Sequence, residues 1–244
     1  IEKPLEYWDN NVYGTINLIA AMQAYNCKKI VFSSSATIYK PVINELITEN
    51  SKLGPINPYG TTKLTIENML HDLTKSQSNN WRIINLRYFN PVGAHISGLL
   101  GENPKGDPNN LFPILLKVAS GEYKNLSIFG NDWPTHDGTC VRDYIHVMDL
   151  ADAHISSLNF ILNSPPIFIN LNIGTGNGIS VLEVVETFKK VNKCELKYSF
   201  EARRQGDAPY VVANNSLALS KLNWLPKRNL IDMCRDAWRW KLNN

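Results

Sequence analysis

The sequence predicts an α/β fold in which a doubly wound parallel sheet is followed by a smaller, mixed α/β domain. Over the first 90 residues, short apolar strands alternate with helical patterns, the order that a parallel sheet with crossover helices requires. From about Pro91 to Leu111 the chain becomes rich in Gly, Pro and Asn. We therefore expect one domain over residues 1–90 and a second over 91–244, with residues 137–165, approximately, returning to the first sheet.

The elements of the first domain follow from apolar spacing and capping residues. Asn57 can cap a helix whose first turn contains Pro58, where the missing N–H has no cost. Apolar residues at helical spacing predict the helix before it, and short apolar runs predict the strands. The predicted elements are, in order, the helix Tyr7–Tyr25, the strand Lys29–Phe32, a helix from Pro58 to about Lys75, and the strand Arg82–Arg87.

The second domain is expected to contain shorter elements and to close over the sheet. Ligands bind in the cleft between such domains, outside the carboxyl ends of the strands. Gly174-Thr175-Gly176-Asn177-Gly178 resembles a phosphate loop, but it follows a late strand and lacks the acidic residue that a dinucleotide fingerprint requires, so we interpret it as a turn. The predicted helices are Leu111–Ser120, Val147–Leu162, Val181–Lys190 and Leu230–Leu242, and the predicted strands are Leu126–Phe129, Phe168–Asn172 and Glu195–Tyr198.

Composition excludes several classes of function. The 244 residues include 25 basic and 22 acidic side chains, a net charge of +3, which is too small to indicate nucleic acid or an acidic membrane as a partner. No apolar run approaches the roughly 20 residues that span a bilayer. The four cysteines form no CxxC pair and the histidines lack the spacing of metal ligands, so we expect no metal, free thiols and a cytoplasmic location.

Tyr59 and Lys63 form the clearest catalytic pattern. Residues at i and i+4 share one face of a helix. The ordinary pKa of tyrosine, near 10, makes it a poor base at neutral pH, but a nearby ammonium favours the phenolate. Alone, so short a pattern is more often a surface aromatic beside a solvated lysine. It gains weight from Ser33-Ser34-Ser35 at the end of the preceding strand, where a hydroxyl can hold a substrate alcohol against the tyrosine.

The combination of the serine-rich strand end with YxxxK is typical of short-chain dehydrogenases, and further motifs narrow the resemblance. Together they resemble the UDP-glucose 4-epimerases, an extended branch with a Rossmann-like sheet. The resemblance implies NAD as cofactor, UDP-glucose and UDP-galactose as substrates interconverted through a 4-keto sugar, and a homodimer. The segments that carry it are Lys3–Asn11, Ser33–Tyr39, Asn57–Gly60, Leu86–Ala94, Asp137–Val147 and Arg203-Arg204-Gln205-Gly206-Asp207.

The resemblance also implies a role for each matching residue. Tyr59 would be the acid/base, and Lys63 would contact the nicotinamide ribose and lower the pKa of Tyr59. Ser35 and Thr37 would hydrogen-bond the sugar hydroxyl. Of the others, Asn10, Tyr88 and Phe89 would line the cofactor; Asn90, Asn110 and Leu111 would face the nucleotide sugar; Ser127, Ile128 and Phe129 would hold uracil; Arg142 and Arg204 would meet the diphosphate; and Asp207 would meet the ribose. Forked guanidinium groups suit a diphosphate better than lysine does.

Two departures from the family pattern lead to further expectations. The family begins with a Gly-rich strand-to-helix turn that binds pyrophosphate, whereas this sequence starts at Ile1 with no such turn before Tyr7. We therefore expect the 244 residues alone to bind NAD poorly and to turn over little. In the family a bulky aromatic four residues after the aspartate of RRxGD excludes N-acetyl sugars; here Val211 occupies that position, which predicts some tolerance of UDP-N-acetylhexosamines.

Two alternatives stay open on the sequence alone. A related nucleotide-sugar 4,6-dehydratase or decarboxylase is the first. Dehydratases carry an Asp-Glu pair where this chain has Ser35-Ala36-Thr37, so elimination would lack its acid and base. A non-catalytic remnant that only binds a nucleotide sugar is the second. Product analysis separates the first from an epimerase, and UDP binding without turnover would indicate the second.

Overall fold

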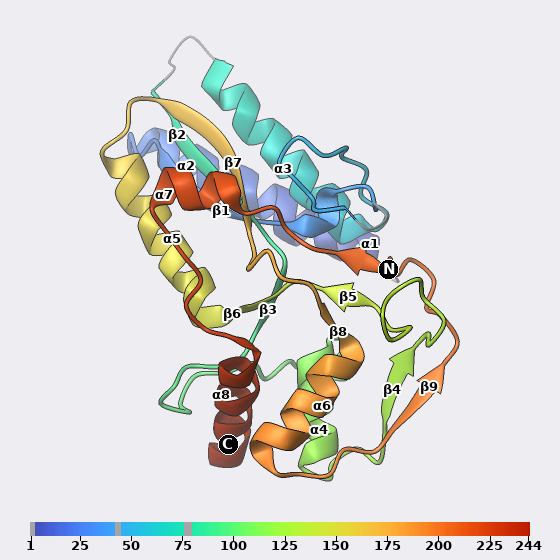
Figure 1. The fold of residues 1–244 in the computed structure, drawn as a ribbon. Helices are drawn as coiled ribbons and strands as arrows, with labels where there is room; N and C mark the ends of the chain where they lie inside the picture. The colour runs from blue at the N-terminus through green and yellow to red at the C-terminus, as the bar shows by residue number, and fades with distance from the viewer. Residues whose placement is uncertain (1–2, 42–44, 76–79) are drawn as a thin grey trace.

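The first layer of the fold is a parallel sheet of three strands. The computed structural model describes residues 3–41, 45–75 and 80–244. Strands β1 (Lys29–Ser35), β2 (Arg82–Tyr88) and β7 (Ile167–Ile173) pair in that order, all parallel (Figure 1). Ser35 lies opposite Tyr88, and Tyr88 opposite Ile173, so the carboxyl ends of the three strands meet at one edge.

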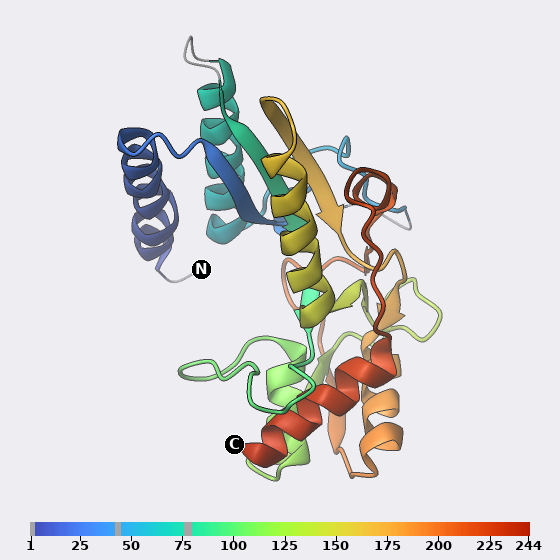
Figure 2. The ribbon, with the colours of Figure 1, turned by 90° about the vertical axis from the view of Figure 1, so that its left-hand side faces the viewer.

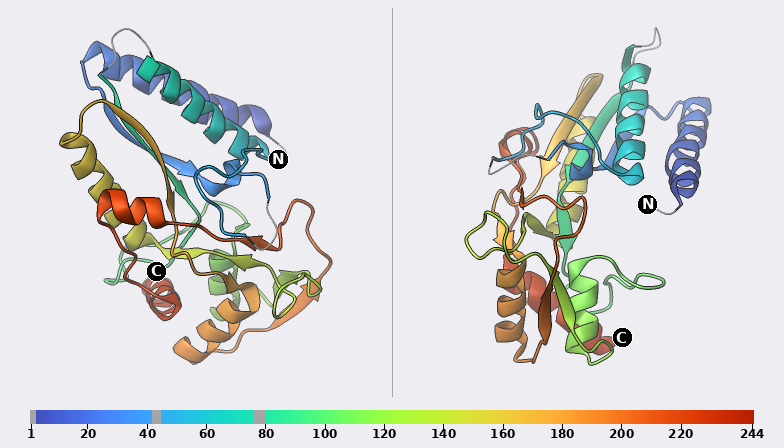
Figure 3. Two further views of the ribbon diagram at one scale, coloured as in Figure 1. Left: turned by 45° about the horizontal axis from the view of Figure 1, so that its top comes forward. Right: turned by 90° about the vertical axis from the view of Figure 1, so that its right-hand side faces the viewer.

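Helices cover both faces of this sheet, which is the predicted doubly wound arrangement. The helices α2 (Gly14–Ala24) and α3 (Pro58–Lys75) lie on one face, and α5 (Val147–Leu162) and α7 (Ser216–Leu222) lie on the other (Figures 2 and 3). Each face has its own apolar core. Trp81 and Ile83 are buried toward α3, whereas Ile84 and Leu86 are buried toward α5, as the alternation of side chains along a strand requires.

The N-terminal helix differs from its prediction in one respect. The sequence predicted one helix over Tyr7–Tyr25, and the structure has α1 (Pro4–Tyr7), a π-helical segment (Trp8–Tyr13) and α2 in succession. Pro4 occupies the first turn, where it lacks no hydrogen bond. Single π-helical turns occur frequently at functional sites, and this one carries Asn11, whose amide donates to Thr62 Oγ1 on α3 at 3.0 Å.

The second half of the chain packs three helices around a separate core. These are α4 (Leu111–Ala119), α6 (Val181–Asn192) and α8 (Leu230–Asn243), with β4 (Leu126–Phe129) paired in parallel to β9 (Tyr198–Glu201) beside them (Figure 1). Serine and asparagine capping boxes start α6 and α8. Short strands join the halves: β3 (Asn90–Val92) pairs with β6 (Tyr144–His146), and β5 (Val141–Arg142) lies between β8 (Ile179–Ser180) and β10 (Tyr210–Val211).

Two strand predictions are corrected by the structure. The segment Phe168–Asn172 was expected in the smaller domain, but it belongs to β7 and pairs with β2, because its apolar residues fill the core on the α5 face. The strand expected at Glu195–Tyr198 starts only at Tyr198, which is the residue that lies opposite Leu126. Both strand positions depend on pairing between distant segments.

Within the described residues, no helix is both long and apolar enough to cross a lipid bilayer.

A buried polar network fixes α3 to the sheet. Arg87 on β2 donates to both carboxylate oxygens of Glu67 on α3, at 3.0 and 2.6 Å, and to the Tyr39 hydroxyl at 2.9 Å. The Tyr39 hydroxyl in turn donates to Asn172 Oδ1 on β7 at 2.7 Å. Ser34 also donates to Glu67. Because every charged member has a partner, the network holds the helix that carries Tyr59 and Lys63 at one distance from the strand ends.

Candidate active site

The edge where the strands end brings the predicted serine and threonine together. Ser35 is the last residue of β1, and the turn Ala36–Ile38 follows it. The Thr37 hydroxyl donates to Ser35 Oγ at 2.9 Å, and the Thr37 amide donates to the same oxygen at 3.2 Å. The two bonds fix the Ser35 oxygen and leave its own hydrogen free for another acceptor.

Tyr59 is held beside Ser35 by a close approach of α3 to that turn. The Asn57 side chain accepts from Gly60 N at 2.8 Å, which confirms the predicted cap. Gly60 is required because a Cβ there would lie 2.6 Å from the Thr37 carbonyl oxygen. The result is that Tyr59 and Ser35 line the same cavity at the strand ends, which is the arrangement that the predicted acid/base chemistry needs.

Lys63 lies one turn farther along α3 and points to β1. Its ammonium donates to the Ser33 carbonyl oxygen at 3.0 Å and lies 5.5 Å from the centre of the Tyr59 ring and 5.0 Å from that of Phe32. Burial lowers the pKa of Lys63. The cation is thus positioned by the strand backbone next to the predicted acid/base.

The ionisation of Tyr59 differs from the expectation. The sequence predicted that Lys63 would lower the pKa of Tyr59, but burial raises that pKa to about 12, helped by Tyr88 and opposed by the Ser35 hydrogen bond. Desolvation disfavours the phenolate more than its polar neighbours favour it. In the protein alone, Tyr59 is therefore neutral at neutral pH, and a bound positive charge is what could favour the phenolate.

A cavity of about 820 Å³ opens at this edge and extends into the second half of the molecule. Thirteen of the predicted site residues line it, although they come from many separate elements and loops. They are Ser35, Tyr59, Tyr88, Phe89, Asn90, Asn110, Leu111, Ser127, Ile128, Phe129, Arg142, Arg204 and Asp207. Its volume is in the range of ligand pockets, and it combines apolar walls with a few polar groups.

The cationic end of the cavity is organised by one carboxylate. Asp207 lies 3.1 Å from Arg204 and 3.7 Å from Arg142. Arg142 also donates to the Ala208 carbonyl oxygen at 2.7 Å, and the Arg204 guanidinium lies 5.3 Å from the centre of the Phe129 ring. Two forked cations are thus held at one end of the cavity, where they can bind a diphosphate in bidentate fashion.

Of the residues that the structure describes, four predicted site residues lie elsewhere. Asn10 lines a second cavity, of about 910 Å³, which Tyr7, Asn11 and Tyr59 also border. Lys63 donates to the Ser33 carbonyl oxygen and Thr37 donates to Ser35, and neither of them lines a cavity. Val211 packs against the buried cluster around Ile38, Tyr39 and Phe89 and likewise lines neither. Tyr59 and Asn109 border both cavities, and of these two Tyr59 is the predicted acid/base.

The sequence did not indicate several residues of the first cavity. Glu102, Asn109, Tyr144 and Met148 line it, and burial raises the pKa of Glu102. None lies in a motif with a chemical rationale of its own. Tyr144 lies in the segment Asp137–Val147, which carries part of the resemblance, and Met148 follows that segment directly, so the segment was the one signal that could have pointed to them.

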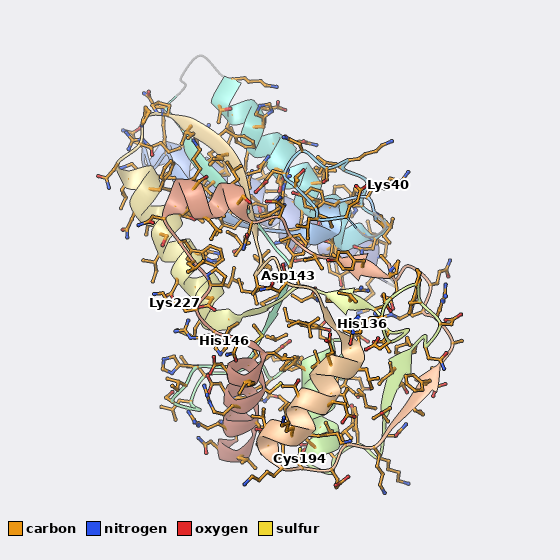
Figure 4. The ribbon with its side chains drawn as sticks, in the orientation of Figure 1. Lys40, His136, Asp143, His146, Cys194 and Lys227 are labelled. Carbon is orange, nitrogen blue, oxygen red and sulfur yellow. The ribbon has the colours of Figure 1, made fainter. Side chains whose placement is uncertain are left out.

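The polar groups at the strand ends, Ser35, Tyr59, Tyr88 and Lys63, fit the nicotinamide end of NAD. Of these four, Tyr59 borders the second cavity, whose other polar lining residues are Lys3, Glu6, Asn10, Asn11, Asp107 and Asn109. The glycine-rich loop 174–178 is engaged internally: Asp143 accepts from Thr175 N at 2.7 Å, Gly176 N at 2.9 Å and the Thr175 hydroxyl at 2.7 Å. The carboxylate occupies the place where a phosphate would sit, and Figure 4 shows Asp143 between the two halves of the molecule. The partners of Asp143 are thus backbone amides and the Thr175 hydroxyl.

A comparison with protein families matches residues 1–174 to the NAD dependent epimerase/dehydratase family. Among curated proteins, the UDP-glucose 4-epimerase of Bacillus subtilis (strain 168) is 51% identical over 241 residues, which are 99% of this chain and 70% of the relative. The bifunctional UDP-glucose 4-epimerase and UDP-xylose 4-epimerase 1 of Pisum sativum is 49% identical over 245 residues, 100% of this chain and 70% of the relative.

Two solved structures also match this chain over nearly its whole length. The UDP-glucose 4-epimerase of Stenotrophomonas maltophila, with NAD and formylated UDP-arabinopyranose bound, has a TM-score of 0.96 and 44% identity; the match covers 99% of this chain and 71% of that one. The Bifidobacterium longum enzyme, in complex with NAD+ and UDP, has a TM-score of 0.93 and 44% identity, over 100% of this chain and 72% of its own.

Proposed function

Because this chain belongs to the NAD dependent epimerase/dehydratase family, and within it to the UDP-glucose 4-epimerases, we propose that it interconverts UDP-glucose and UDP-galactose by inverting the configuration at C4. The observation that carries the proposal is the position of Tyr59. Tyr59 borders both cavities, and Ser35 lines the first of them with it. A sugar in the first cavity and a nicotinamide in the second would thus meet at one phenol.

The chain's own residues account for the proton transfer. NAD, when bound, supplies the acceptor and then the donor of a hydride at C4. The Tyr59 phenolate takes the proton of the 4-hydroxyl through its contact with Ser35, and returns it when the sugar is reduced again. Lys63, fixed on the Ser33 carbonyl, keeps a positive charge beside the phenolate. No proton or electron is gained overall, so the reaction is an isomerisation.

The distribution of polar groups supports the turning of the sugar between the two hydride transfers. Arg142, Arg204 and Asp207 lie together at the nucleotide end of the cavity. We propose that they hold the diphosphate and ribose while the hexose is held loosely, because inversion requires the sugar to present its other face to the same tyrosine. The uracil would lie against the β4 strand, where Phe129 contacts Arg204.

We also propose a homodimer formed through the N-terminal helix. Leu5, Tyr13, Ile16 and Leu18 on α1, the π-helical segment and α2 are about half exposed or more, and apolar side chains grouped on one helix favour a protein partner. Sedimentation of the wild-type protein and of an Ile16→Glu variant tests the dimer, which the charge would dissociate.

We also propose the cytoplasmic location that the sequence predicted. The four cysteines are free thiols, which suits a reducing compartment.

Product analysis with NAD supplied tests the proposed reaction. We expect UDP-galactose to yield UDP-glucose with no 4-keto-6-deoxy sugar, and Tyr59→Phe to lower kcat by about 10²–10⁴ while UDP binding is kept. Tyr25→Phe is the matched control, because that side chain is 88% exposed and lines neither cavity. Accumulation of a 4-keto-6-deoxy sugar would indicate a dehydratase, and UDP binding without turnover would indicate a non-catalytic protein.

A further inference from the structure

The first turn of α3, which carries Tyr59, is attached to the N-terminal segment by hydrogen bonds that the proposed reaction does not use. The Thr62 hydroxyl donates to the Tyr59 carbonyl oxygen at 2.8 Å and accepts from the side-chain amide of Asn11 at 3.0 Å. Thr62 is fully buried, whereas Asn11 lies in the π-helical segment that precedes α2. Because the ends of a helix fray more readily than its middle, this attachment supports Tyr59 where the helix itself holds it least.

The direction of these hydrogen bonds is fixed from the Tyr59 end. A carbonyl oxygen can only accept, so Thr62 gives its one hydrogen to Tyr59, and the Thr62 oxygen must accept from Asn11. The amide nitrogen of Asn11 therefore faces Thr62, and its Oδ1 faces Asn10, whose amide donates to it at 3.0 Å. Every hydrogen in this chain of three bonds points toward Tyr59, an arrangement in which successive hydrogen bonds strengthen one another.

The other end of this chain of hydrogen bonds lies at the second cavity. Asn10 and Asn11 both line that cavity, and Tyr59 lines it as well. The chain uses the amide nitrogen of Asn10 and leaves its Oδ1 for a hydrogen-bond donor in the cavity. A group bound there and the backbone of Tyr59 are thus connected through three hydrogen bonds.

The same N-terminal segment also contacts the ring of Tyr59. Helix α1 lies beside α3 (Figure 1), and Tyr7 at its end packs edge-on against Tyr59, with 6.1 Å between the ring centres and 66° between the ring planes. Edge-to-face contact is a preferred geometry of aromatic pairs. Tyr7 lies four residues before Asn11, and both line the second cavity. The backbone and the ring of Tyr59 are therefore both held by residues on the wall of that cavity.

We propose that Asn11 is a positioning residue for the acid/base: through Thr62 it fixes the first turn of α3, and together with Tyr7 it sets the phenol of Tyr59 at the border of the two cavities. This inference rests on the proposed function, in which a sugar and a nicotinamide meet at that phenol. A general acid/base has to lie within hydrogen-bond reach of the oxygen that it serves, and a displacement of about 1 Å can lower the rate about 10²-fold. Asn11 and Thr62 orient Tyr59 and take no part in the proton transfer itself.

Variants at position 62 separate the hydrogen bond from the packing of the side chain. Thr62→Val keeps the shape and removes the hydroxyl, Thr62→Ser keeps the hydroxyl, and Asn11→Ala removes the donor. In the protein without ligands, containing isotope-labelled tyrosine, the NMR signal of the Tyr59 ring is the one that Tyr59→Phe lacks. We expect Thr62→Val and Asn11→Ala to shift or broaden this signal and Thr62→Ser to leave it at the wild-type position. Thr65→Val is the matched control, because the Thr65 hydroxyl donates to the Thr61 carbonyl oxygen of the same helix, whereas Asn11 donates to Thr62.

Kinetics with NAD and UDP-galactose give the second measurement. We expect Thr62→Val and Asn11→Ala each to lower kcat about tenfold and to leave KM for UDP-galactose unchanged, because the diphosphate would be held by Arg142 and Arg204 on other elements. The double variant should lose little more than either single variant, since both remove the same connection. Thr65→Val should have the kcat and KM of the wild type.

Three results would overturn the positioning role. The first is a Tyr59 signal in Thr62→Val that matches the wild type. The second is a Thr62→Ser variant as impaired as Thr62→Val, which would assign the effect to packing. The third is a rise in KM that accompanies the fall in kcat, which would indicate a general disturbance of the fold. A wild type that does not epimerise, but whose Tyr59 signal responds to Thr62→Val and Asn11→Ala as expected, would support the positioning role and contradict the proposed function.

Discussion

Arg204 lies 3.1 Å from the Asp207 carboxylate, whereas Arg203, its neighbour in sequence, turns away to Asp132 at 2.7 Å and to the ring of Trp133. Of these two arginines, Arg204 lines the first cavity and Arg203 does not. Adjacent residues of the same type therefore have different environments, and this difference makes a controlled experiment possible.

We expect Arg204→Lys to weaken UDP binding about tenfold, which corresponds to about 1.4 kcal/mol, because an ammonium cannot bind a diphosphate in bidentate fashion. Titration calorimetry with UDP measures the change. Arg203→Lys is the control and should bind UDP as the wild type does. Equal losses in the two variants would remove Arg204 from the nucleotide site.

The buried pair of Arg87 and Glu67 should dominate the stability of the sheet. Both side chains are 3% exposed, so Glu67→Gln leaves a guanidinium without its counter-charge and should reduce the free energy of unfolding by about 3–5 kcal/mol. Asp72→Asn, which removes the exposed partner of Lys75, should cost about 1 kcal/mol or less. Urea unfolding followed by circular dichroism measures the loss in free energy of unfolding for each variant. Similar losses would show that the buried pair stabilises the fold no more than the exposed pair does.

The sequence predicted most of what is local. Tyr59 and Lys63 fall on one helix face because their spacing alone decides it, and Asn57 caps that helix as its side chain predicts. Long apolar segments such as Val147–Leu162 were found at their true bounds. Thirteen of the predicted site residues line one cavity. Their order along the chain alone does not suggest this.

What the sequence did not predict depends on contacts between distant segments. Strands of two or three residues, such as Val141–Arg142, exist only because Tyr210–Val211 lies beside them, and so short a run has no pattern of its own. The placement of β7 required knowledge of its pairing with β2. The pKa of Tyr59 likewise depends on burial by residues from several elements, which spacing along α3 cannot express.

Asp143 and the glycine-rich loop provide a test of a motif that resembles a phosphate site. Gly174→Ala would place a methyl group against Asp143 Oδ2 and the Ala213 side chain, and we expect a loss of about 2–4 kcal/mol in the free energy of unfolding. Gly14→Ala is the control: it is exposed in α2 with only Asp9 O near the new carbon, and should stabilise by about 0.5–1 kcal/mol. Thermal unfolding measures both, and a fully stable Gly174→Ala would show that the loop is not closed on Asp143.

The buried phenols predict how stability responds to alkali. The pKa of Tyr59 is raised from 10.0 to about 12, mainly by burial. Between these values the unfolded chain has lost the proton and the folded protein keeps it, so the free energy of unfolding falls as the pH rises from 10 to 12. Below pH 10 this contribution is constant. Tyr59→Phe should make the fall shallower, and Tyr25→Phe, with a side chain that is 88% exposed, should leave it unchanged. Identical slopes in all three proteins would contradict the burial of Tyr59.

Val211, the residue to which sugar specificity is assigned by resemblance, does not line the first cavity. It lies opposite Arg142 in the β10–β5 pair and packs against the buried cluster that contains Phe89 and Ile38. Phe89 forms part of the cavity wall. The side chain at 211 can therefore affect the hexose only by displacing Phe89 or by extending past it into the cavity. We expect the wild type to epimerise UDP-N-acetylglucosamine and Val211→Tyr to reduce that turnover about tenfold more than it reduces turnover of UDP-glucose, since the ring has to occupy space beside the sugar. Ratios of kcat/KM for the two substrates measure the effect, and Val211→Ile is the control because it adds one methylene group without a ring. A wild type that rejects the N-acetyl sugar would show that the wall formed by Phe89 already closes the pocket whatever residue stands at 211.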